Sequence, residues 1–171
     1  MKKQKGFSLI ELLIVVAIIL IIAAIAIPNL IRSKMAANEA SAVASLRTIN
    51  TGEVTYNNTY PGKFATLGQL GPGAASCPAT GPTIAASCLI VNLLANATAA
   101  ATAKSGYIFT ITDSAAGTIA AGTGYATEAA PAAQGSTGTR GFCSDQNLVL
   151  FYVSASNGLG TCTAANGSLP L

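Results

Sequence analysis

Glu11 is the residue of this 171-residue chain whose type and position most clearly ask for a chemical explanation. It lies near the start of an apolar run, and no polar side chain follows it between Leu12 and Ile27. Inside a membrane a carboxylate costs about 2.5–3.5 kcal/mol, and such groups usually face a partner. Two interpretations are open: Glu11 reaches the membrane–water interface from its place near the helix start, or it meets a positive group of a neighbouring copy.

The apolar run that holds Glu11 is long enough to span a bilayer. Residues 7–27 would form a helix roughly 31 Å long, about the thickness of the hydrocarbon core. Three lysines precede Gly6, and Gly6 precedes the run, whereas a secretory signal peptide places its small-residue cleavage site after the apolar core. Cleavage after Gly6 would leave the run in the mature protein and create a free amine on Phe7. Without cleavage the lysines would hold the N-terminus in the cytoplasm, so the body faces outward either way.

The order of these features resembles the type IV prepilin signature. Residues 6–12 read GFSLIEL, a short basic leader precedes them, and about twenty apolar residues follow up to Ile27-Pro28-Asn29. The close resemblance covers about residues 2–60. It implies a class III signal peptide that a membrane prepilin peptidase cuts between Gly6 and Phe7, and the same enzyme then methylates the new N-terminus on Phe7. It also implies that Glu11 neutralises the Phe7 amine of an adjacent subunit during filament assembly.

The sequence after Pro28 predicts that the helix continues with a different character. Met35, Ala42, Leu46, Ile49 and Tyr56 follow one another at spacings of seven, four, three and seven, which gives one apolar stripe at helical period. A proline inside a helix kinks it without necessarily ending it. We therefore expect an amphipathic helix whose stripe packs on the chain's own core.

The rest of the chain predicts a small antiparallel sheet. Alternation and a high content of β-branched and aromatic residues indicate a strand over 107–112, and we also expect strands over 123–129, 139–144 and 148–153. A sheet laid on the second half of the helix would give both elements a partner, and the resemblance implies the same α+β, pilin-like fold. Five segments follow: a cleaved leader (1–6), a transmembrane or filament-core helix half (7–28), an amphipathic helix half (29–58), a connecting loop region (59–105), and the sheet with a disulfide-closed tail (106–171).

The four cysteines are typical of an oxidising compartment. Four cysteines allow three pairings, and we favour Cys77–Cys88 with Cys143–Cys162 because each pair closes a short loop in a segment with little core of its own. The resemblance also implies a C-terminal disulfide. A metal site is the rival interpretation, but the chain has no histidine and no Cys-x-x-Cys pair, so we expect no metal and no cofactor.

Composition argues against an enzyme and against nucleic-acid binding. Without histidine neither a Ser-His-Asp nor a Cys-His arrangement can form, the six acids are scattered, and no phosphate-binding loop is present. Charged residues make up 9% of the chain, against about 25% in typical proteins. A chain cut after Gly6 keeps six basic and six acidic side chains, so it lacks the positive charge that nucleic-acid binding needs.

We therefore expect a type IV pilus subunit that polymerises through its N-terminal helix. Its expected partners are further copies of itself, the prepilin peptidase and the assembly platform in the inner membrane. It would cross the inner membrane once before assembly and then reach the cell surface. Two alternatives stay open: a pseudopilin of a type II secretion system, and a membrane-anchored binding domain that never polymerises.

Overall fold

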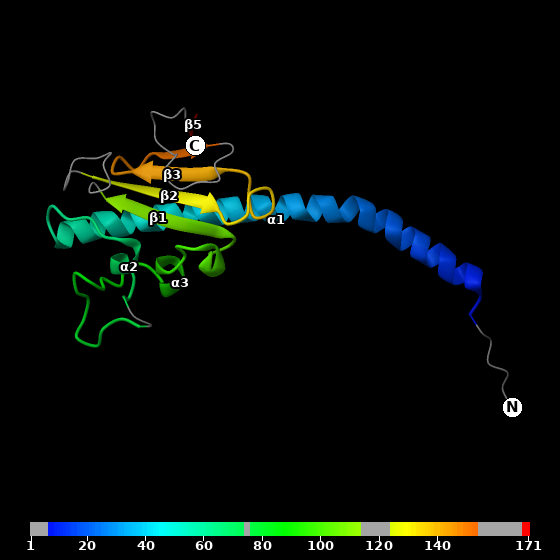
Figure 1. Ribbon diagram of the computed structural model, residues 1–171, viewed down its shortest axis with the longest axis horizontal. Helices are drawn as coiled ribbons and strands as arrows, with labels where there is room; N and C mark the ends of the chain where they lie inside the picture. The colour runs from blue at the N-terminus through cyan, green and yellow to red at the C-terminus, as the bar shows by residue number, and fades with distance from the viewer. Residues whose placement is uncertain (1–6, 74–75, 114–123, 154–168) are drawn as a thin grey trace. The chain divides into compact units, whose positions relative to one another are not determined.

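The computed structural model describes residues 7–73, 76–113, 124–153 and 169–171. The chain divides into two compact units, Met1–Lys34 and Met35–Leu171, and each is described by itself. One long helix, α1 (Leu9–Thr59), contributes to both units. The remaining helices and all the strands belong to the second unit (Figure 1).

The first unit is a single stretch of apolar helix. The large apolar side chains between Phe7 and Ile31 are between 46% and 83% exposed, so they have no cover within the described chain. The helix continues through Pro28, which costs it one backbone hydrogen bond without ending it. By length and composition, α1 is the one helix among the described residues that could cross a membrane.

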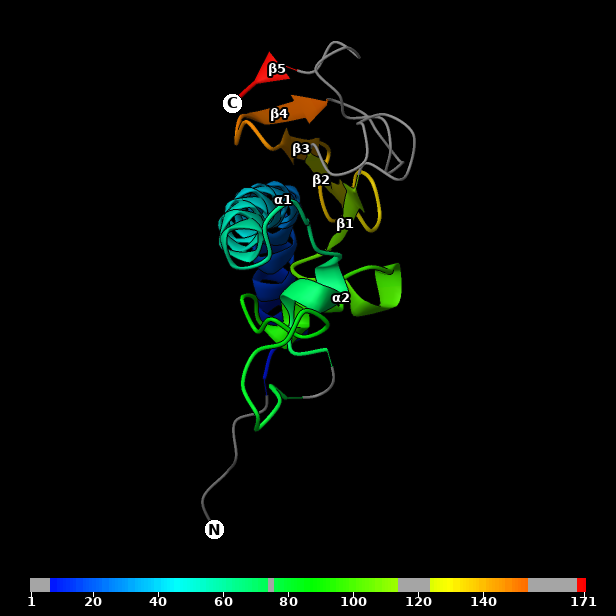
Figure 2. The same cartoon turned by 90° about the vertical axis from the view of Figure 1, so that its left-hand side faces the viewer.

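The second unit packs the later part of α1 on the sheet, as Figure 2 shows with α1 viewed along its axis. Ala42, Leu46, Ile49 and Tyr56 are buried, which confirms four of the five members of the predicted apolar stripe, and the fifth, Met35, is half-buried. They join aromatic side chains of the strands, including Tyr107, in one core. Burying this stripe supplies the stabilisation that a lone amphipathic helix lacks in water.

The sheet is antiparallel throughout and follows the order of the chain, β1-β2-β3-β4-β5. Four strands lie where the sequence predicted them, with bounds shifted by up to two residues, and the α+β fold class is confirmed. The fifth was not predicted, because two residues carry no readable alternation. The strands are β1 (Tyr107–Asp113), β2 (Tyr125–Pro131), β3 (Gly141–Asp145), β4 (Leu150–Val153) and β5 (Leu169–Pro170).

Three short helices follow α1 in the sequence and precede the first strand: α2 (Leu67–Leu70), α3 (Asn92–Ala95) and the 3₁₀ helix η1 (Ala100–Thr102). A capping box starts α2, because Thr66 and Gln69 satisfy each other's free backbone amides. Gly71 follows α2 where a β-carbon would meet the side chain of Ala95, so this close approach requires glycine. Leu70 and Leu94 carry α2 and α3 into the core.

A disulfide joins Cys77 to Cys88, as predicted. The loop that it closes is also held by α1, since the Tyr56 hydroxyl donates a hydrogen bond to the Ile84 carbonyl at 2.8 Å. The second predicted pair, Cys143–Cys162, involves a residue outside the described ranges and stays a prediction.

A buried carboxylate, Glu39, fixes α1 to the start of β3. It accepts hydrogen bonds from the Thr139 amide and hydroxyl, both at 2.9 Å, and from the Arg140 guanidinium at 2.8 and 2.6 Å. Next to it, the Asn38 side chain donates to the Thr137 carbonyl at 2.8 Å. Burial acts to raise the pKa of Glu39, but the bonds from Thr139 and Arg140 outweigh it and hold that pKa below its usual value.

Candidate assembly site

The first turn of α1 brings Ser8 and Glu11 together. The helix begins at Leu9, which makes Glu11 its third residue. The Ser8 backbone N–H donates a hydrogen bond to Glu11 Oε2 at 2.9 Å, and the Ser8 carbonyl accepts from the Leu12 amide. Glu11 therefore closes the helix N-terminus from the third position, as the acidic member of a capping box does.

This local bond leaves Glu11 able to bind a second group. A carboxylate has two oxygens and about four acceptor sites, and the Ser8 bond occupies one of them. The first turn of a helix also favours negative charge, because its free amides carry partial positive charge. The capping contact was not predicted, although the Ser-x-x-Glu spacing of residues 8–11 was a readable signal for it.

The side chains around Glu11 form an apolar surface. Six residues of α1 line a shallow apolar hollow on one face of the helix: Leu9, Leu12, Leu13, Val16, Ala17 and Leu20. Within the described part of the chain the single ion pair is Glu39–Arg140, so no described cation neutralises Glu11. The site thus combines a bare apolar helix face with a carboxylate that keeps spare acceptor capacity.

The structure places some of the predicted site residues and leaves others outside its description. Phe7 lies before α1, which begins at Leu9, and is 83% exposed. Gly6 lies outside the described residues, so the geometry of the Gly6–Phe7 bond is not part of the description. Cleavage, methylation of Phe7 and the contact of Glu11 with a neighbour's amine remain predictions. In the residues that are described, no group of three or more cysteine or acidic side chains comes together as a metal site would need.

The sequence and the helix together define a class of protein: one with an N-terminal methylation motif. Residues 1–27 match the family described as "Prokaryotic N-terminal methylation motif". This match confirms the predicted resemblance to type IV prepilins. It covers the lysine-rich leader, Glu11 and almost all of the apolar run.

Two curated relatives are type IV pilus proteins. The chain is 45% identical over 74 residues to the "Type IV wide pilus major component PilA4" of Thermus thermophilus, a match that covers 42% of this chain and 56% of that protein. It is 44% identical over 54 residues to the "Type IV major pilin protein PilA" of Myxococcus xanthus, which covers 32% of this chain and 24% of that protein. The chain therefore spans about half the length of the first relative and about a quarter of the second. No solved structure matches the chain significantly.

Proposed function

We propose that this protein is a structural subunit of a type IV pilus, which polymerises through its N-terminal helix into a cell-surface filament. The observation that carries the proposal is the exposed apolar helix with Glu11 in its first turn, inside residues that match the methylation motif. The names of the two relatives, both major pilus proteins, support it. A helix surface of this kind needs lipid or other copies around it, because water solvates it poorly.

Maturation begins with hydrolysis of the Gly6–Phe7 peptide bond by a prepilin peptidase. The reaction removes the lysine-rich leader and leaves an amine on Phe7, which the same enzyme methylates. The match of residues 1–27 to the methylation motif supports this step. So does the position of Phe7, which lies before α1 and is exposed, because a peptidase requires an accessible backbone.

Assembly then pairs Glu11 of one subunit with the Phe7 amine of the next. The spare acceptor sites of Glu11 and the absence of a described cation beside it support this pairing. The apolar surface around Glu11 lowers the local dielectric once copies pack together, so an uncompensated carboxylate there would be costly. The amine supplies the missing positive charge only in the cleaved chain.

The subunit crosses the inner membrane once before assembly, and the assembly platform there draws it into the growing fibre. One helix of sufficient length and apolar composition supports the membrane-inserted form. No catalytic role is needed for this function, since packing of identical copies is its whole chemistry.

Fractionation of cells that produce this chain tests the proposal. We expect most of the mature protein in fibres sheared from the cell surface, and we expect Gly6→Ala to keep the protein in the membrane fraction. A mature protein confined to the cell envelope would instead indicate a secretion pseudopilin. Full function of an uncleaved Gly6→Ala protein would indicate a membrane-anchored domain that does not polymerise.

A further inference from the structure

Two exposed cations, Arg32 and Lys34, lie directly after the apolar part of α1. Both belong to the first unit, and Ile31, the last large apolar residue before them, is itself 48% exposed. In the sequence they are the only charged residues between Glu11 and Glu39. The apolar part of the helix therefore has a carboxylate near its first end and two cations at its second end.

The spacing of these charges matches the thickness of a bilayer. The helix between Glu11 and Arg32 is roughly 31 Å long, and the hydrocarbon core of a membrane is about 30 Å thick. With Glu11 at one boundary of the core, Arg32 reaches the other boundary, and Lys34 lies about 3 Å beyond it. The headgroup layer adds about 5–7 Å on each side, so both cations fall within it.

Neither cation has an acidic partner in the part of the chain that the structure describes. Ion pairs along a helix join residues three or four positions apart, and no acid stands at those positions from Arg32 or Lys34. Glu39 is the nearest acid in the sequence, and it already binds Arg140 at 2.6 Å in the single ion pair of the described residues. Both cations are therefore available to an anion from outside the chain.

The position of the two cations is unusual for a flank that faces outward. Lysine and arginine are concentrated on the cytoplasmic side of membrane segments, and the three leader lysines follow that rule. Arg32 and Lys34 follow the membrane segment on its outward side, where such residues are fewer. A contact at the outer surface gives them a role that the orientation of the chain does not.

We propose that Arg32 and Lys34 bind the phosphate groups of anionic phospholipids at the outer surface of the inner membrane. A guanidinium can bind two phosphate oxygens at once, and an ammonium binds phosphate as a compact charge. Residues two positions apart point to nearly opposite faces of a helix, so each cation contacts a different lipid. The inference rests on the membrane-inserted form in the proposed function and adds the class of lipid that this form binds.

The contact belongs to the inserted subunit and breaks when the fibre forms. Lipid phosphate holds the outer end of the apolar helix at a fixed depth, which keeps Glu11 near the opposite boundary of the core. Attraction between exposed charges is largely screened beyond about 8 Å at physiological ionic strength. Withdrawal of the subunit by two helical turns, roughly 11 Å, therefore releases both cations.

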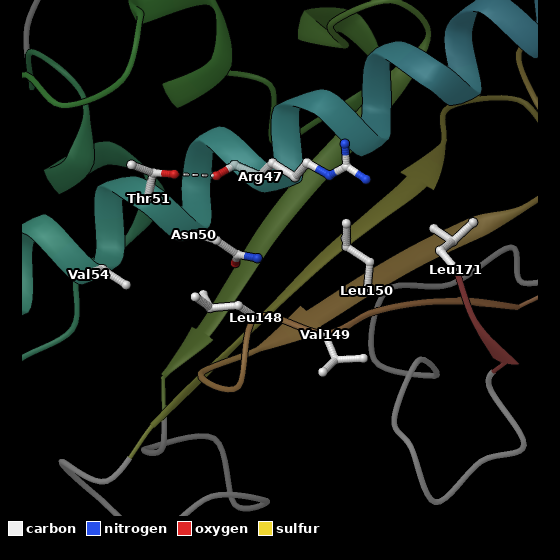
Figure 3. Close-up of a pocket in the computed structure, with 8 residues that line it drawn as sticks. All are labelled: Arg47, Asn50, Thr51, Val54, Leu148, Val149, Leu150 and Leu171. Carbon is white, nitrogen blue, oxygen red and sulfur yellow. Dashed lines mark hydrogen bonds between the residues drawn. The ribbon is translucent and has the colours of Figure 1, made fainter.

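Arg47 provides a matched control on the same helix. It is exposed like Arg32, but it belongs to the second unit, where it lines an apolar groove of about 580 Å³ together with Leu148 and Leu150 (Figure 3). The stretch of α1 between Arg32 and Arg47 is several times longer than the headgroup layer is thick. Removing the charge of Arg47 should therefore leave the lipid contact unchanged.

Tryptophan quenching in vesicles tests the proposal with the full chain. The chain has no tryptophan, so Leu30→Trp introduces a single reporter close to Arg32. The protein is reconstituted in mixtures of phosphatidylglycerol and phosphatidylcholine, in which one of the two lipids carries bromine on its acyl chains. Bromine quenches only nearby tryptophan, so the leader lysines at the other end of the helix do not contribute. The ratio of quenching by the two brominated lipids gives their relative affinity for this site.

We expect phosphatidylglycerol to be preferred about two- to fivefold over phosphatidylcholine, and added chloride should weaken this preference. The double variant Arg32→Gln, Lys34→Gln should bring the ratio to about one, and each single variant should retain part of the preference. Arg47→Gln should retain all of it. These positions are exposed, so the substitutions leave the core of the second unit intact.

Three results would overturn the proposal: equal quenching by the two lipids, an unchanged ratio in the double variant, or the same loss in Arg47→Gln. Inorganic phosphate, compared with chloride at equal ionic strength, separates lipid headgroups from free phosphate. A preference that disappears in phosphate and persists in chloride would identify free phosphate as the better ligand, and it would also overturn the lipid contact.

Alkaline carbonate extraction of membranes from producing cells comes first, because it tests insertion alone. If the wash releases the chain, the membrane-inserted form in the proposed function fails, and this inference fails with it. If the chain stays in the membrane and the two lipids quench equally, the phosphate contact alone is refuted.

Discussion

Glu11 has a partner in its own chain before any second copy arrives, because the Ser8 amide already donates to its side chain. The residue therefore has two separable roles: closure of the helix N-terminus and, by our proposal, neutralisation of a neighbour's amine. A neutral glutamine can fill the first role, since Gln also serves at this position of a capping box. Only a carboxylate can fill the second.

This separation gives a prediction for two substitutions. Glu11→Gln should be processed and inserted normally but should yield few fibres, because it keeps the cap and loses the charge. Glu11→Ala should assemble as poorly and should also lose about 0.5–2 kcal/mol of helix stability with the cap. Counting sheared fibres and measuring cleaved protein in membranes provide the readout. Normal fibres from Glu11→Gln would show that capping is the whole role of Glu11.

Glu39 predicts how stability depends on pH. Its folded-state pKa lies below the ordinary value of 4.5, so its contribution to folding is complete above pH 4.5 and declines as the pH falls through the lowered pKa. We expect the full chain in neutral detergent to lose stability below pH 4.5, followed by tyrosine fluorescence. Glu39→Gln should reduce this acid dependence, and an unchanged acid limb would contradict the assignment.

Arg140, the residue just before β3, supports the same carboxylate. Removing it in Arg140→Ala takes two charged hydrogen bonds from buried Glu39 but leaves those from Thr139, so we expect a loss of about 1–3 kcal/mol in unfolding free energy. Chemical unfolding of the full chain at pH 7 measures it. Lys63→Ala, at an exposed cation elsewhere, should change stability little. A loss no larger than that of the control would show that the Glu39–Arg140 contact does not stabilise the fold.

At the scale of elements, the short helices α2 and α3 depend on a close approach at Gly71. A methyl group there would meet the Ala95 side chain, so Gly71→Ala should destabilise the second unit by about 1–3 kcal/mol. Gly68→Ala is the matched control, because a β-carbon at Gly68 meets nothing and Gly68 lies inside α2. Alanine should there be neutral or slightly stabilising. Equal stabilities of the two variants in urea would contradict this packing.

The elements also show what could be predicted from the sequence. The stripe from Ala42 to Tyr56, the alternation in β1 and the apolar run in β4 are local signals within a few residues of one another, and they predicted the correct elements. The Glu39–Arg140 bond joins residues 101 positions apart, and the Asn50–Ser144 bond joins residues 94 positions apart. No local pattern in a single sequence reveals such pairings, because they depend on how distant segments come together in the folded sheet.

In the candidate site, too, the residues that could be predicted are those that belong to a local sequence motif. Gly6, Phe7 and Glu11 could be proposed from the sequence because the proposed signal is their order along the chain. The capping role of Ser8 had a readable motif that was not used.

At the scale of the whole molecule, the account makes this protein one repeating part of a larger object. Its first unit exposes an apolar helix, and its second unit buries a compact core around the rest of α1. Exposure of this apolar surface to water is unfavourable in an isolated chain, whereas lipid or neighbouring copies can cover it. By our proposal, removal of the leader at Gly6 allows the helix to pass from lipid to the fibre.

The mass and N-terminal sequence of the protein sheared from the cell surface test this claim most directly. We predict that the chain begins at Phe7, carries one methyl group on its terminal amine, and lacks all three leader lysines. Surface fibres built from chains that still begin at Met1 would contradict the account, because the amine that Glu11 needs would not exist.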